Sequence, residues 1–165
     1  MNTTRPTPSK DEIALLPEFG RLGLDRITLV DTARQAAEAA AALRDHPIWG
    51  FDTESKPTFV KEQVSDGPHI VQLSTLHHAW VFQLTDPGCS EQVAALLAHA
   101  GHTKAGFGLG DDTRRIVAKL AVTPVAVLEL NHVFRQRGYR KDMGVKGAVA
   151  VLFNQRFIKS KKAAT

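Results

Sequence analysis

Two acidic residues, Asp52 and Glu54, lie two positions apart within an apolar stretch of this 165-residue chain. Successive side chains of a β-strand point to opposite faces, so a strand over 48–54 would carry both carboxylates on one face. Two carboxylates this close repel each other and lose hydration when buried, which favours a hard divalent cation such as Mg²⁺ or Mn²⁺. The alternative is an edge strand with a solvated acidic face. The apolar residues that precede Asp52 favour a buried central strand, and therefore the metal.

A second acidic pair, Asp111 and Asp112, follows a glycine-rich stretch and opens a predicted helix. The helical repeat places Asp112 at the border of the buried stripe and turns Asp111 toward water. The buried stripe is predicted to consist of Thr113, Ile116, Val117 and Leu120. Acids are also favoured in a first helical turn by the helix dipole alone, which is the simpler explanation for Asp111. The glycine spacing is G-x-G-x-G and differs from the dinucleotide-binding G-x-G-x-x-G, so the sequence argues against a dinucleotide site.

Strands and helices alternate along the rest of the chain, which predicts an α/β fold with a mixed sheet. The predicted helices cover 10–16, 31–44, 90–100, 111–120 and 144–153, and residues 130–138 have a weaker helical pattern. The predicted strands cover 26–30, 48–54, 70–75, 79–84, 102–106 and 125–130, with a hairpin between the third and the fourth. Residues 1–9 are predicted to be a flexible tail, and residues 10–165 a single domain.

Composition excludes several classes of protein. Hydrophobic residues at 43% and charged residues at 23% are ordinary for a soluble globular chain. No run of apolar residues is long enough to span a membrane, and the single cysteine, Cys89, cannot form an internal disulfide, so a cytoplasmic setting is expected. The net charge of +4 permits a polyanionic partner without requiring one.

Taken together, residues 51–54, 71–74 and 104–112 resemble the first two motifs of the DEDD 3′–5′ exonucleases, in particular the ribonuclease D and Werner-syndrome exonuclease group. The resemblance implies a ribonuclease H-like mixed sheet flanked by helices and a site for two divalent cations, Mg²⁺ or Mn²⁺. In that family the residue matching Asp52 bridges the two metals, the one matching Glu54 binds one of them, and the one matching Asp112 assists the other. These three residues are therefore the expected catalytic and metal-binding set.

The third motif of this family, a Tyr or His followed by a fourth metal-binding Asp, has no counterpart in the sequence. No acidic residue follows Asp142, and the only tyrosine, Tyr139, precedes the last predicted helix. Residues 144–153 resemble the helix that comes before that motif. The expected exonuclease-like domain is thus C-terminally truncated, and its activity is expected to be weakened by the loss of the fourth carboxylate.

The resemblance implies a hydrolase that shortens single-stranded or frayed DNA or RNA from the 3′ end. The alternative is a non-catalytic nucleic-acid-binding or assembly domain that retains the fold. Residues expected to contact the nucleic acid are Lys56, Phe59, Phe107 and Arg115, through base stacking and phosphate contacts. An ordinary loop and a solvated helix face explain these residues as well. The oligomeric state is left open.

Overall fold

The computed structural model describes residues 4–55 and 67–159. They divide into two compact units, one formed by residues 22–129 and the other by residues 4–21 together with 130–159. The elements are, in chain order, α1 (Lys10–Ala14), a 3₁₀ turn (Leu24–Arg26), β1 (Ile27–Val30), α2 (Ala33–Arg44), β2 (Ile48–Glu54), β3 (Ile70–Ser74), β4 (Ala79–Gln83), α3 (Pro87–Leu97), β5 (Thr103–Gly106), α4 (Leu109–Leu120), β6 (Val127–Glu129), α5 (Leu130–Gln136) and α6 (Gly144–Phe153). The single domain predicted over 10–165 stays a prediction.

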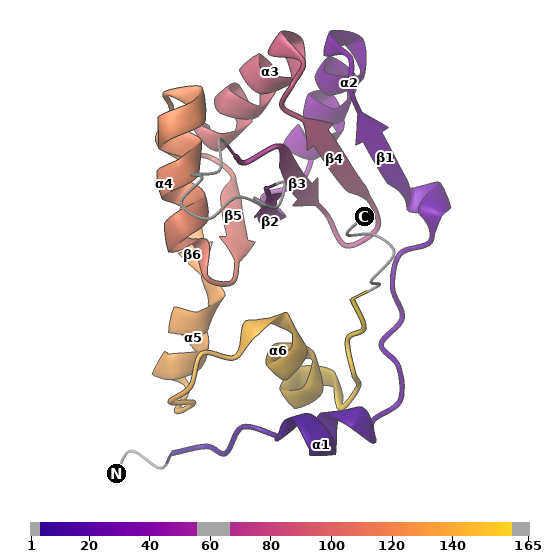
Figure 1. The fold of residues 1–165 in the computed structure, drawn as a ribbon, viewed down its shortest axis with the longest axis vertical. Helices are drawn as coiled ribbons and strands as arrows, with labels where there is room; N and C mark the ends of the chain where they lie inside the picture. Colours follow the sequence, from indigo (N-terminus) through magenta and orange to yellow (C-terminus); the bar gives the residue numbers. More distant parts are fainter. Residues whose placement is uncertain (1–3, 56–66, 160–165) are drawn as a thin grey trace, which may run out of the picture. The chain divides into compact units, whose positions relative to one another are not determined.

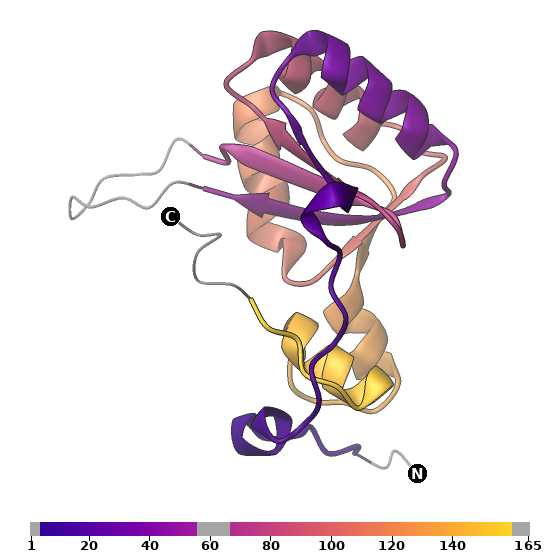
Figure 2. The same ribbon diagram turned by 90° about the vertical axis from the view of Figure 1, so that its right-hand side faces the viewer.

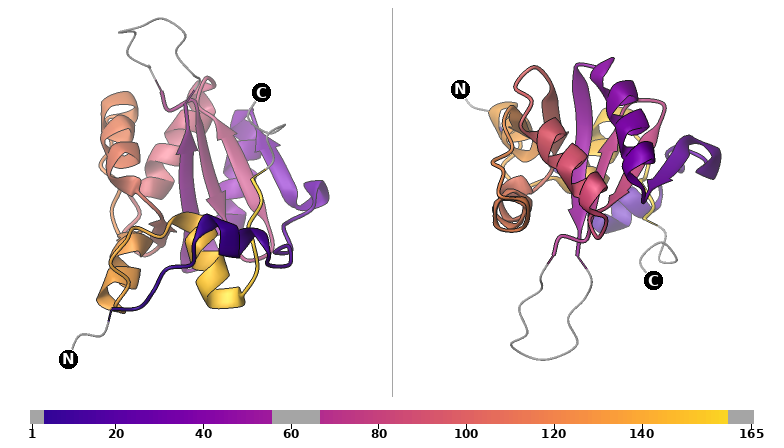
Figure 3. Two further views of the ribbon diagram at one scale, coloured as in Figure 1. Left: turned by 60° about the horizontal axis from the view of Figure 1, so that its bottom comes forward. Right: turned by 90° about the horizontal axis from the view of Figure 1, so that it is seen from above.

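The larger unit is built on a six-stranded sheet with the order β1-β4-β3-β2-β5-β6 (Figure 1). β3 pairs antiparallel with β2 on one side and with β4 on the other, and the left view of Figure 3 shows the three strands side by side. The pairs β1–β4, β2–β5 and β5–β6 are parallel. The predicted mixed α/β sheet and the hairpin between β3 and β4 are confirmed, and β2 occupies the predicted residues.

One face of this sheet holds the hydrophobic core. Strand residues of that face, such as Phe51, Leu73 and Phe82, are buried together with residues of α2, α3 and α4 in one cluster. Figure 2 shows α2 and α3 on the same side of the strands. Burying a large apolar side chain contributes about 1.5–3 kcal/mol, so this cluster supplies the main driving force for forming the sheet. Alternation along β2 then places Asp52 and Glu54 on the opposite face.

The core contains a lysine that the sequence did not identify as buried. Lys104 on β5 is fully buried, and its Nζ donates to the carbonyl oxygens of His99 at 2.6 Å and Val125 at 3.1 Å. Its ammonium also lies 5.5 Å from the ring centroid of Trp49, which adds a cation–π attraction. Burial lowers the pKa of Lys104 below its usual value. The lysine therefore ties β5 to the loops on either side of it.

The smaller unit holds α1, α5 and α6. Its segments are joined by pairing of Arg5 with the 138–139 turn, where the Arg5 amide donates to the Gly138 carbonyl at 2.8 Å. Asn131, which is buried, accepts hydrogen bonds from the amides of Met143 and Gly144 at the start of α6. The backbone pairing of Arg5 is a contact that the polar composition of residues 1–9 did not predict.

Three local predictions are wrong. The helix predicted to begin at residue 31 begins at Ala33, because Thr32 caps it: the Thr32 side chain accepts from the Gln35 amide in a capping box. α3 begins at Pro87 after the cap Asp86 because proline is favoured in a first turn, where its missing N–H costs nothing. Val117, predicted to be buried, is 42% exposed, because the buried stripe of α4 is centred on Leu109 and Ile116. None of the helices in the described part of the chain has the length and apolar character needed to cross a membrane.

Candidate active site

The two acids of β2 lie on a central strand. β2 pairs with β3 along one side and with β5 along the other, which excludes the edge-strand alternative. Asp52 stands opposite Gln72 and is exposed, and Glu54 stands opposite Ile70 and is half-buried. The two carboxylates therefore lie side by side on the face of the sheet that is turned away from the core, at the carboxyl end of the strand.

Two glycines bring the start of α4 against β2. A side chain at Gly106 would meet the carbonyl oxygen of Phe51 at 2.4 Å, so only glycine permits this approach. Gly108 has a φ of 65°, a left-handed conformation that glycine adopts without steric cost, and it turns the chain into the helix. The glycine-rich stretch thus serves to pack α4 closely on the acidic strand.

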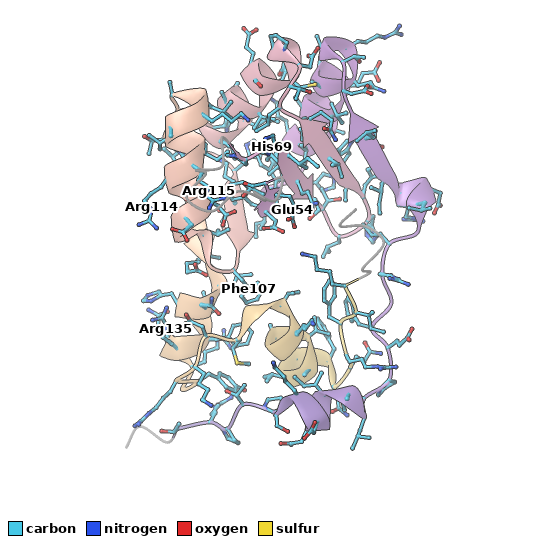
Figure 4. All side chains as sticks on the ribbon, viewed as in Figure 1. Glu54, His69, Phe107, Arg114, Arg115 and Arg135 are labelled. Atoms are coloured by element: carbon cyan, nitrogen blue, oxygen red, sulfur yellow. The ribbon has the colours of Figure 1, made fainter. Side chains whose placement is uncertain are left out.

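Two side chains of α4 reach the end of β2. The Thr53 hydroxyl donates a hydrogen bond to Asp112 Oδ1, and Arg115 Nη1 donates to Ser55 Oγ at 3.0 Å. Asp112 and Arg115 are three residues apart and so share one face of the helix, and Thr53 and Ser55 are two residues apart and so share one side of the strand. The two hydrogen bonds therefore join the same face of α4 to the same side of the chain at the end of β2. Figure 4 shows Arg115 on the side of α4 nearer to the strands and Arg114 on its outer side.

Asp111 faces water, as predicted. Its carboxylate pairs with Arg114 one turn along the helix, and both side chains are more than two-thirds exposed, at 73% and 77%. Exposed pairs of this kind contribute little to stability. Asp111 therefore has the simpler of the two expected roles, a favourable charge in the first turn of a helix.

A carboxylate on β6 holds the first turn of α4. Glu129 accepts two hydrogen bonds, from the Gly108 amide at 3.0 Å and from the Leu109 amide at 2.8 Å. Pairing of Gly106 with Glu129 at the ends of β5 and β6 places this side chain at the helix start. Negative charge is favoured at this end of a helix because the first amides have no partner within it.

The structure brings the three predicted ligands to one end of β2 without gathering them into a group. Asp112 is bonded to Thr53, the residue between Asp52 and Glu54, and Thr53 points to the opposite face of the strand. Across residues 4–55 and 67–159, no three His, Cys, Asp or Glu side chains form a cluster able to hold a metal ion. The catalytic and metal-binding roles of these three acids stay predictions.

The predicted nucleic-acid contacts are divided by the structure. Arg115 lies at the end of β2 through its bond to Ser55. Phe107 is half-buried in the turn that precedes α4. Lys56 and Phe59 lie outside the described residues.

Three functional candidates escaped the sequence analysis, namely Thr53, Ser55 and Glu129. Thr53 is the middle residue of the acidic motif, and the helical repeat indicated only that Asp112 borders the core. Glu129 could be found only from the register of β6 against β5, which the sequence pattern does not define. The sequence did show that Glu129 lies near the end of a predicted strand, but not that this strand end lies beside the start of α4.

The Thr53 hydrogen bond can be tested by substitution. Thr53→Val keeps the shape of the side chain and removes the donor, so Asp112 loses its partner. Hydrogen bonds to charged groups contribute about 1.5–3 kcal/mol, and because Asp112 is half-buried we expect a loss of about 1 kcal/mol in the free energy of unfolding. Urea denaturation measures this loss. Thr53→Ser, which keeps the hydroxyl, should retain most of the stability; equal stability of the valine variant would mean that the bond contributes nothing.

Among the comparisons with known proteins, only the comparison with solved structures gives matches. No protein-family model matches the chain, and no curated protein matches it in sequence at a significant level. Among solved structures, the Nibbler EXO domain of Aedes aegypti superimposes with a TM-score of 0.71 and 17% identity over 86% of this chain and 75% of that one. RNase D of Trypanosoma brucei gives 0.73 and 18% over 83% of this chain and 50% of that one, and it was also crystallised with RNA U12. The EXD2 exonuclease domain soaked in Mg gives 0.53 and 18% over 68% of this chain and 60% of that one.

At 17–18% sequence identity, the similarity to these structures establishes the fold alone. The chain has the fold of the exonuclease domains, and the predicted ribonuclease H-like class is confirmed. It spans half the length of the Trypanosoma brucei RNase D chain.

Proposed function

We propose that the chain is a metal-dependent 3′–5′ exonuclease domain that acts on single-stranded or frayed nucleic-acid ends. The observation that carries this proposal is the position of Asp52 and Glu54. They share one face at the carboxyl end of a central strand, within the fold of exonuclease domains, and the helix that bears Asp112 is packed against the same strand.

The carboxylates of Asp52, Glu54 and Asp112 are of the right chemical type for a hard cation, although they do not form one cluster in the described chain. Carboxylate oxygens are the ligands that Mg²⁺ and Mn²⁺ prefer, and Asp52 and Glu54 offer them from one face. A carboxylate has about four lone-pair sites, so the single bond from Thr53 leaves Asp112 with acceptor capacity. A bound ion would stabilise the negative charge that develops on the phosphodiester. Asp52 and Glu54 would hold it, and Asp112 would assist from the start of α4.

Arg115 supports the choice of a nucleic acid as substrate. Its guanidinium reaches the end of the acidic strand, where a backbone phosphate would lie if the scissile bond were placed at Asp52 and Glu54. Guanidinium groups bind phosphate through two parallel hydrogen bonds, and such contacts make binding dependent on salt. The complex of RNase D with RNA U12 supports RNA as one such substrate.

One observation favours the alternative, a nucleic-acid-binding domain without catalytic activity. The three acids do not gather into a metal-holding group within the described chain, and Asp112 is bonded to Thr53. A domain of this kind would bind an oligonucleotide through α4 and leave it intact.

Thermal unfolding with and without Mn²⁺ separates the two functions. A ligand that binds only the folded state stabilises it by about 2.7 kcal/mol at a free concentration of about one hundred times its Kd. For a chain of this size we expect Mn²⁺ to raise Tm by roughly 5–10 °C. The same samples should shorten a 5′-labelled single-stranded RNA or DNA stepwise from its 3′ end, and EDTA should stop the reaction.

The outcomes are distinct. A rise in Tm with stepwise shortening supports the exonuclease. An unchanged Tm with binding but no shortening of the oligonucleotide would instead establish the binding domain. Release of internal fragments would contradict both, because it would show an endonuclease.

A further inference from the structure

The carboxylate of Glu129 makes an unusual contact with the helix that carries Asp112. Its two oxygens accept from two consecutive backbone amides, Gly108 N at 3.0 Å and Leu109 N at 2.8 Å. Hydrogen bonds from amides to an ionised carboxylate are roughly twice as strong as those between neutral groups. The contact joins the end of β6 to the first turn of α4 across twenty residues of sequence.

The first turn of α4 needs such a contact. Its cap, Gly108, is in a left-handed conformation and has no side chain with which to bond the free amides. A second glycine, Gly110, lies inside the turn, where it costs about 0.5–1 kcal/mol relative to alanine. A turn with one glycine at its cap and another inside it frays easily, and Asp112 lies in this same turn. The direction of the Asp112 carboxylate therefore depends on how firmly this turn is held.

The same contact explains why the glycine-rich stretch is not a phosphate site. Amides at a helix start attract anions, and a phosphate would be the usual occupant. Here the negative charge is supplied by the chain itself, since Glu129 already occupies both amides. The Gly108 and Leu109 amides therefore stabilise the start of the helix and are not available to bind a phosphate.

We propose that Glu129 is a positioning residue for Asp112: by clamping the Gly108 and Leu109 amides it fixes the first turn of α4 and so the carboxylate that assists the metal. This role rests on the proposed function. Glu129 acts through the helix, and it touches neither metal nor substrate.

The test compares Glu129→Gln with the wild-type chain by two measurements. Glutamine keeps one oxygen and replaces the other by an amide group that cannot accept from a backbone N–H, so one clamp bond and the charge are lost. We expect hydrogen exchange of the Gly108 and Leu109 amides to accelerate by about tenfold or more, and the affinity for Mn²⁺, measured by calorimetric titration, to fall by about tenfold, as for other outer partners of metal ligands. Glu38→Gln, an exposed glutamate on α2, is the control for lost charge.

A rescue variant separates positioning from direct ligation. Gly110 has open space around its Cβ position and no positive φ, so Gly110→Ala should stiffen the turn without a clash. Added to Glu129→Gln, it should recover a threefold or greater part of the lost Mn²⁺ affinity. Such recovery supports positioning, because stiffening the turn cannot replace a missing ligand.

Three results would overturn the inference. Mn²⁺ affinity that is unchanged in Glu129→Gln would show that the clamp does not position Asp112. A loss that Gly110→Ala leaves in full would make Glu129 itself a ligand. A wild-type chain that binds no Mn²⁺ would defeat the proposed function before any variant is compared, and the positioning role with it.

Discussion

Replacing Asp52 with asparagine should abolish both the Mn²⁺-induced rise in Tm and the shortening of oligonucleotides. Asp52 is the exposed carboxylate on the face of β2 that is turned away from the core, and asparagine keeps its size while removing the charge that a divalent ion requires. Loss of an outer partner of a metal ligand typically costs about 10–100-fold, so loss of the ligand itself should lower the rate by more than about a hundredfold. The rate of loss of the 3′-terminal nucleotide in Mn²⁺ measures the effect.

The control is Asp111→Asn. Asp111 lies beside Asp112 in the sequence but points to water and pairs with Arg114, so its loss should change the rate by less than about threefold, as expected for an exposed pair of small energy. Without metal, Asp52→Asn should leave Tm unchanged or raise it slightly, because it removes one of two like charges. An Asp52→Asn variant that keeps its full rate would place the catalytic metal elsewhere.

Replacing Trp49 with alanine should cause the largest loss of stability. Trp49 is fully buried in β2, its indole N–H donates to the Leu43 carbonyl at 2.7 Å, and its ring faces both Lys104 and His102. Truncation of a buried tryptophan costs about 3–5 kcal/mol, a large fraction of the 5–15 kcal/mol that is typical of a domain. The remaining Lys104 ammonium would also lose its aromatic partner. Urea denaturation measures the change in free energy of unfolding.

Two further variants make this prediction decisive. Trp49→Phe keeps an aromatic ring and removes the indole donor, while the Leu43 carbonyl still accepts from the His46 amide at 3.0 Å. Loss of this one hydrogen bond should cost about 0.5–1.5 kcal/mol, which can be measured even if the alanine variant does not fold. Leu76→Ala removes a side chain that is 90% exposed and should change stability by less than about 0.5 kcal/mol. A loss below about 1 kcal/mol in Trp49→Ala would contradict the packing described for the core.

The sequence predicted well the elements whose signal is local. The bounds of β2 and α6 follow from an apolar run and from a 3.6-residue repeat. The start of α1 has an equally local cause, because Ser9 and Glu12 form a capping box there. Asp111 was assigned to water for the same reason, since the helical repeat alone defines its direction.

What depends on register between distant strands could not be predicted. β1, the first strand of the sheet, pairs with β4 and not with the strand that follows it, and no local pattern encodes this choice. The bond between Asp112 and Thr53 and the clamp by Glu129 depend on the register of β2 and β6 against β5. Lys104 was likewise invisible, because a lysine is almost never expected to be fully buried.

The position of β2 also bears on how this sheet avoids aggregation. β5 pairs with β2 only over residues 48–50, and beyond that point α4 contacts the strand end through the hydrogen bonds of Asp112 with Thr53 and of Arg115 with Ser55. Proteins often place charges on a strand to stop its edge from pairing with another molecule. β2 has no such need, because β3 and β5 pair with it and α4 covers the rest. Protection of a strand edge against self-association therefore does not account for the charges of Asp52 and Glu54.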